Sequence, residues 1–245
     1  MRLPPADLPY LREQLLELAA QVRDAWDASD PPRAQIDSPT LLRDALSQLI
    51  DMLGHVQEAR LAEEADPAEI NTLGEYGLHL LDELAQLAAG LDQPTLATRI
   101  EQLCLPFALW IARQGGEIRS LGPVVNALAH YANAASHPQT MAALYTCCCE
   151  LIEAASPACE EQASQGAQPH PWRLLLLNRA IVATRSHNPE LMEAAFDAIV
   201  EHLPEEARRF FAEGMEQMAI IDYPDPVRDV VRRYFLAHGT ARLLH

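Results

Sequence analysis

The chain has 245 residues and a formal net charge of −17, and all 18 of its basic residues are arginine. Such an acidic chain repels nucleic-acid phosphates and anionic lipid surfaces, so we expect neither nucleic-acid binding nor membrane binding. The absence of lysine excludes Schiff-base catalysis, a pyridoxal phosphate anchor, a phosphate-loop lysine and a serine–lysine dyad. We expect no cofactor.

The first residues of the chain do not form a secretory signal. Asp7, Arg12 and Glu13 interrupt the apolar stretch that such a signal requires, which predicts a cytoplasmic location. The five cysteines fit this location, because their odd number and their spacing match no disulfide framework or zinc finger. We expect all five to be reduced thiols.

Four helices are predicted in the first half of the chain. Asp7 and Asp66 are good N-cap residues, and Glu69 completes a capping box with Asp66. Pro106 should kink or split the fourth helix, which the pair Gly115-Gly116 ends. The predicted ranges are 7–26, 38–53, 66–90 and 94–115. The second helix is either interrupted at Gly54 or extends to residue 62.

The stretch from Ser120 to Cys149 contains no charged residue, although 22% of the chain is charged. A segment that avoids charge in this way is usually buried, so we place it at the centre of the fold. Helical spacing of its apolar residues predicts two helices, 123–135 and 138–156, packed back to back.

The stretch from Pro157 to Pro171 is rich in small and polar residues and has no apolar period, which predicts a surface linker. It divides the chain into an N-terminal part, 1–156, and a C-terminal part, 172–245, whose helices pack on the same core. The helices predicted after the linker are 172–185, 189–203, 204–221 and 226–237.

A polar residue followed by proline opens helix after helix, and no segment is typical of a strand. We therefore predict an all-α protein of serial αα-hairpins, forming either a short right-handed solenoid or a compact helical bundle. The solenoid resembles degenerate tetratricopeptide or HEAT-like repeats, although the helix starts are unevenly spaced and the tetratricopeptide pattern does not align.

One helix carries a candidate metal site. Glu75, His79 and Glu83 lie at positions i, i+4 and i+8, so their imidazole and carboxylate groups share one face and could hold a divalent ion. A solvated amphipathic face explains the same pattern. Three adjacent cysteines, 147–149, point about 100° apart on a helix and cannot all bind one ion, so we expect Cys148 to be a core residue.

The function predicted from these observations is a noncatalytic protein-interaction or scaffold module, with a homodimer as an open alternative. The rival hypothesis is an enzyme that binds a metal or small molecule between the third and fifth helices. The interaction hypothesis rests on the uncharged polar stripe of the fifth helix, whose side chains would contact the partner. The alternative is that these side chains hydrogen-bond within the core. The predicted contact residues are Tyr76, His79, Asn126, His130 and Asn133.

Overall fold

The fold was taken from a computed structural model, which describes residues 3–29, 39–62, 66–165 and 170–239. Within these ranges the chain is helical, apart from short connections and a single backbone bridge between Ile118 and Ala155. The helices are α1 (Leu8–Ala28), α2 (Pro39–Leu61), α3 (Pro67–Gly90), α4 (Pro94–Gln102), α5 (Cys104–Arg113), α6 (Leu121–Ala134), α7 (Pro138–Ala154), α8 (Pro157–Gln165), α9 (Pro171–Arg185), α10 (Pro189–His202), α11 (Pro204–Ile220) and α12 (Asp225–Tyr234), with a π-helical turn over Phe235–Gly239. The predicted all-α fold is confirmed.

Side-chain caps account for the positions at which several helices begin. Asp7 and Asp66 each accept a backbone hydrogen bond of 2.9 Å, from Tyr10 and Ala68 respectively. Proline then occupies a first-turn position, where its missing N–H leaves no intrahelical bond unmade. Both predicted starts are confirmed, while Ser38, the predicted cap of α2, lies outside the described residues.

Proline splits the predicted fourth helix, but the break is at Leu103, which separates α4 from α5. Pro106 cannot donate to the carbonyl of Gln102, and its ring crowds that carbonyl, so the helix ends one turn before the proline. Gly115 ends α5 with a φ of +81°, and Gly116 donates to the carbonyl of Ile111 over 3.0 Å. The predicted glycine stop is confirmed, and α2 continues through Gly54 without interruption.

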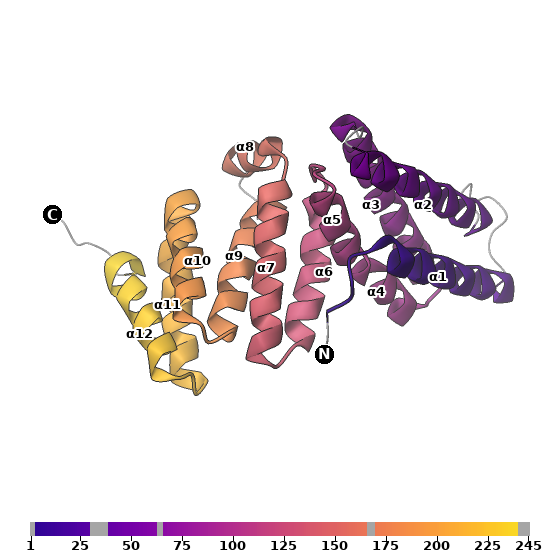
Figure 1. The fold of residues 1–245 in the computed structure, drawn as a ribbon. Coiled ribbons are helices and arrows are strands. Elements are labelled where there is room, and N and C mark those ends of the chain that lie inside the picture. Colours follow the sequence, from indigo (N-terminus) through magenta and orange to yellow (C-terminus); the bar gives the residue numbers. More distant parts are fainter. Residues whose placement is uncertain (1–2, 30–38, 63–65, 166–169, 240–245) are drawn as a thin grey trace.

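The helices stack as sequential hairpins in two rows. From α4 onward, α4, α6 and α9 pack successively in one row, and α5 packs against α7 and α10 against α12 in the other. Figure 1 shows α6, α7, α9, α10 and α11 side by side, with α1–α4 at one end of the stack and α12 at the other. None of the helices in the described residues is both long and apolar enough to cross a membrane.

The uncharged segment forms the middle of this stack, as predicted. Leu128 of α6 and Leu144 of α7 are fully buried, with α5 on one side and α9 on the other. The two helices do not pack back to back, however. α7 packs chiefly on α9 and touches α6 only slightly, because α9 inserts beside both helices of the segment.

The stretch predicted as a surface linker forms a helix over Pro157–Gln165. Cys159 and Ala163 are buried one turn apart, and α8 rests on α9 through this short apolar face. Two buried residues are too few to produce a recognisable apolar period. Residues 166–169 lie outside the described residues, and the division of the chain into two parts stays a prediction.

Candidate functional site

The predicted polar stripe of α6 lies on the surface. Asn126 and Asn133 are exposed, and neither side chain hydrogen-bonds to another residue in the described part of the chain. His130 is partly buried, with its Nε2 atom 3.5 Å from a carboxylate oxygen of Glu101 on α4. These exposures exclude the alternative in which the stripe is a hydrogen-bond network inside the core.

The predicted residues of α3 divide between two roles. Tyr76 and His79 are exposed, and the Nε2 atom of His79 lies 3.1 Å from Glu83. Glu75 instead holds the start of α6, because its carboxylate accepts hydrogen bonds from the backbone of Arg119 and from the backbone and hydroxyl of Ser120, over 2.5–3.0 Å.

The geometry of Glu75 bears on the proposed metal ligands. Its two carboxylate oxygens are engaged by residues at the start of α6, while His79 and Glu83 pair with each other. Among the described residues, no three histidine, cysteine or acidic side chains are grouped closely enough to hold a metal ion. The structure therefore does not assemble the predicted trio into a metal site.

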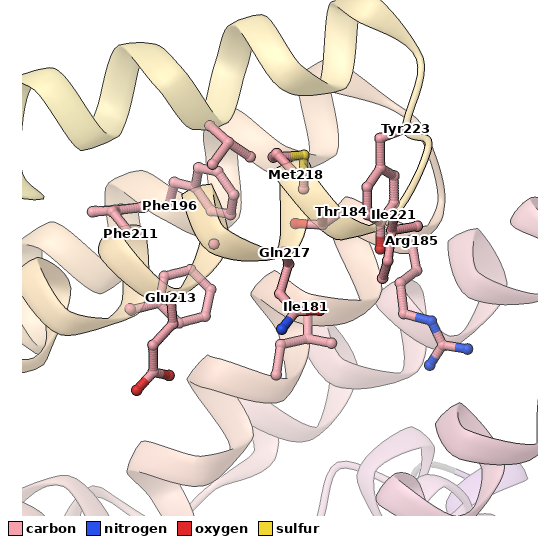
Figure 2. A pocket seen from close by; sticks show the side chains of 13 residues that line it. Ile181, Thr184, Arg185, Phe196, Phe211, Glu213, Gln217, Met218, Ile221 and Tyr223 are labelled. Carbon is pink, nitrogen blue, oxygen red and sulfur yellow. The ribbon is translucent and has the colours of Figure 1, made fainter.

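A groove that the sequence did not predict lies between α9 and α11. Its volume is about 390 Å³, and its interior is formed by aromatic rings, chiefly Phe196 of α10 and Phe211 of α11. Figure 2 shows Gln217 of α11 reaching across toward Ile181 of α9, while the carboxylate of Glu213 points away from the aromatic rings. The groove therefore has an apolar interior and polar groups at its edge.

Large apolar side chains are exposed at the mouth of this groove. Ile181 is 45% exposed and Ile221 is 44% exposed, and Ile220, next to it in the chain, is 77% exposed. Scattered exposed apolar residues are ordinary, but several gathered around one groove are typical of an interaction surface. The aromatic interior is well packed, since Phe196 meets the rings of Phe211 and Tyr234 edge to face, with 5.2 Å between centroids in each case.

Arg185 joins the groove to the polar stripe. It lines the groove, and its guanidinium donates hydrogen bonds of 2.7 Å to the carbonyl oxygens of Ala132 and Ala135 at the C-terminal end of α6. A cation at this position also complements the helix dipole. Arg185 therefore ties the groove-lining helix α9 to the end of α6 that carries Asn133.

The groove offers binding surface and no recognisable catalytic group. Its titratable side chains are Arg185, Glu213 and Tyr223, and burial raises the pKa of the Tyr223 hydroxyl, which makes it a weaker acid and keeps it protonated. No nucleophile stands beside a general base there. Such a lining suits apolar contact with a second molecule.

The apolar pairs Phe210-Phe211 and Ile220-Ile221 were the available sequence signal for this groove. In the first pair Phe211 is buried and Phe210 is partly buried, whereas Ile220 and Ile221 at the end of α11 are both exposed, so more apolar surface is present than the core of the protein uses. The apolar and polar residues of α9 are not separated onto opposite faces, so its pattern does not reveal which face remains open. Comparison with known proteins finds no matching family model, no matching curated protein and no matching solved structure.

Proposed function

We propose that the protein is a noncatalytic protein-interaction module, built as a short right-handed solenoid of αα-hairpins similar to tetratricopeptide or HEAT-like repeats. The observation that carries the proposal is the aromatic-lined groove between α9 and α11, whose mouth exposes Ile181 and Ile221. We include the uncharged stripe of α6 in the same binding surface, supported by Arg185, which ties the groove-lining helix α9 to the end of α6. Exposed Tyr76 and His79 on α3 are its outer contacts.

The occupant that fits this groove is an amphipathic helix of another protein. Helices bind such grooves by inserting apolar side chains spaced three to four residues apart, which is the spacing needed to follow a channel between two helices. The chain carries 35 acidic residues against 18 arginines, and Glu213 stands at the edge of the groove. The bound helix should therefore carry basic residues beside its apolar face. Their attraction to the acidic chain would steer the helix onto this surface.

We also propose that the protein works in the cytoplasm without a cofactor. The support for this location is chemical, because all five cysteines are unpaired, as is usual for proteins kept in a reducing compartment.

Selection from a displayed library of helical peptides tests the proposal directly. Peptides recovered on the wild-type chain should carry apolar residues at helical spacing with arginine or lysine beside them. Ile181→Glu should abolish their binding, because it places a charge in the apolar mouth of the groove. The matched control is Met52→Glu on α2, where a side chain of 38% exposure lies far from the groove in the stack.

Two results would contradict the proposal. In one, the selected peptides bind the Ile181→Glu chain as tightly as the wild type. In the other, light scattering shows a dimer that Ile181→Glu converts to a monomer, which would make a second copy of the chain the occupant of the groove.

A further inference from the structure

Arg179, in the middle of α9, is a charged side chain without an internal partner. Its Nε atom is buried and has no hydrogen-bond acceptor, and its guanidinium forms no ion pair within the described residues. The ring of Tyr145 on α7 lies 6.0 Å from the guanidinium carbon. The other two arginines of α9 are paired, Arg173 with Glu206 at 3.0 Å and Arg185 with two carbonyl groups.

An unpaired guanidinium of this kind requires an explanation. Burying a charged donor without an acceptor is costly, so such groups are nearly always matched by protein, water or a bound ion. Scarcity of acidic residues does not explain it, because the chain has 35 of them for 18 arginines. The side chain as a whole is partly buried, and its Nε atom has no acceptor within the described residues, so its position points to an acceptor supplied by water or by a bound molecule.

Arg179 lines a pocket enclosed by α7, α8, α9 and α10. The pocket has a volume of about 340 Å³, within the range of small-molecule sites, and it is distinct from the groove between α9 and α11. Its apolar wall includes Ile152, Leu176 and the indole of Trp172. It thus combines a single unpaired cation with a few apolar side chains.

The other charged groups of the pocket are already matched to each other. His202 lies 3.1 Å from a carboxylate oxygen of Glu160, and its ring meets Trp172 edge to face at 5.6 Å. This arrangement joins α8 to α10 and leaves Arg179 as the group facing the pocket that still lacks an acceptor.

We infer that this pocket binds a small organic carboxylate, a site independent of the groove and of the proposed protein partner. The carboxylate would accept two parallel hydrogen bonds from the planar guanidinium of Arg179, a geometry that arginine forms well with carboxylates. The apolar or aromatic body of the ligand lies against Ile152, Leu176 and Trp172. An inorganic oxyanion such as phosphate has no apolar group to cover these three side chains.

Isothermal titration calorimetry with three probes tests the inference on the full chain. Benzoate supplies both the carboxylate and an apolar body, benzamide supplies the same body without charge, and inorganic phosphate supplies charge without a body. Each is titrated into the wild type, Arg179→Gln and Arg12→Gln. The last removes the same charge at an exposed position on α1, where Arg12 pairs with Asp51 at 2.6 Å.

The expected result is saturable binding of one benzoate per chain to the wild type and to Arg12→Gln. Benzamide, and benzoate with Arg179→Gln, should bind about tenfold more weakly or worse, because each loses the charged hydrogen bonds. The inference is overturned if the wild type does not bind benzoate, if benzamide binds as tightly as benzoate, or if only phosphate binding depends on Arg179. The comparison of benzoate with benzamide uses the wild type alone, so it stands even if Arg179→Gln fails to fold.

Discussion

Replacing Gly77 by alanine should destabilise the protein, because α3 packs against α5 closely at this position. A Cβ atom built on Gly77 would lie 2.2 Å from Cζ of Phe107 and 2.9 Å from a methyl carbon of Leu49. Optimal contacts between carbon atoms are about 3.5–4.0 Å, and Phe107 is fully buried, so its ring has little room to move. Overpacking of this kind costs about 1–3 kcal/mol.

Helix propensity acts in the opposite direction and must be subtracted. Alanine is favoured over glycine inside a helix by about 1 kcal/mol, so the net loss for Gly77→Ala is about 0–2 kcal/mol. In a chain of this size that corresponds to a fall in Tm of at most about 8 °C. Gly54→Ala in α2 is the matched control, because nothing lies within 4 Å of its added Cβ.

Thermal unfolding followed by circular dichroism measures both variants. Gly54→Ala should raise the Tm by about 2–4 °C, since it gains helix propensity without a clash. If Gly77→Ala is as stable as Gly54→Ala, α3 and α5 are not packed through this glycine and the arrangement described above is wrong.

Four further predictions concern the buried thiols of α7 and the two side chains that hold the ends of α6. Thiol labelling of the native protein should modify Cys149 first and Cys148 last of the cysteine triplet, because Cys148 is 0% exposed and burial raises its pKa. Burial also raises the pKa of the Cys147 thiol to about 11, so its labelling should accelerate as the pH rises toward that value. Chemical denaturation should show that Arg185→Gln costs about 2–4 kcal/mol through its two lost bonds to α6, and that Glu75→Gln costs about 1–3 kcal/mol through weaker capping of α6.

The helices were predictable from the sequence because their boundary signals are local. Proline at the first turn, Asp66 as a cap and Gly115 as a stop act within a few residues, and the structure confirms them. Burial of the uncharged segment was predictable for a similar reason, since it follows from composition over a long window. The burial of Cys148 relative to Cys147 and Cys149 followed from helical phase alone.

The packing partners of each helix were not predictable in this way. α6 and α7 are adjacent in sequence and share an uncharged composition, yet α7 packs chiefly on α9. The packing partner of a helix is decided by contacts between residues far apart in the chain. A single sequence does not show which of these residues touch. The groove and the Arg179 pocket depend on the same long-range contacts, because α9 and α11 enclose one while α7, α8, α9 and α10 enclose the other.

The exposed stripe of α6 supplies the remaining test of the interaction surface. Asn126 and Asn133 are exposed without side-chain partners in the described part of the chain, so alanine at either position should leave the Tm unchanged or raise it slightly through helix propensity. Replacing an asparagine that is hydrogen-bonded in the core would instead lower the free energy of unfolding by about 1–3 kcal/mol. If the stripe belongs to the proposed binding surface, calorimetry with a peptide selected on the wild type should show weaker binding to Asn133→Ala, which lies at the end of α6 that Arg185 holds. Unchanged peptide affinity together with unchanged stability would remove the stripe from the binding surface and leave the groove alone as the site.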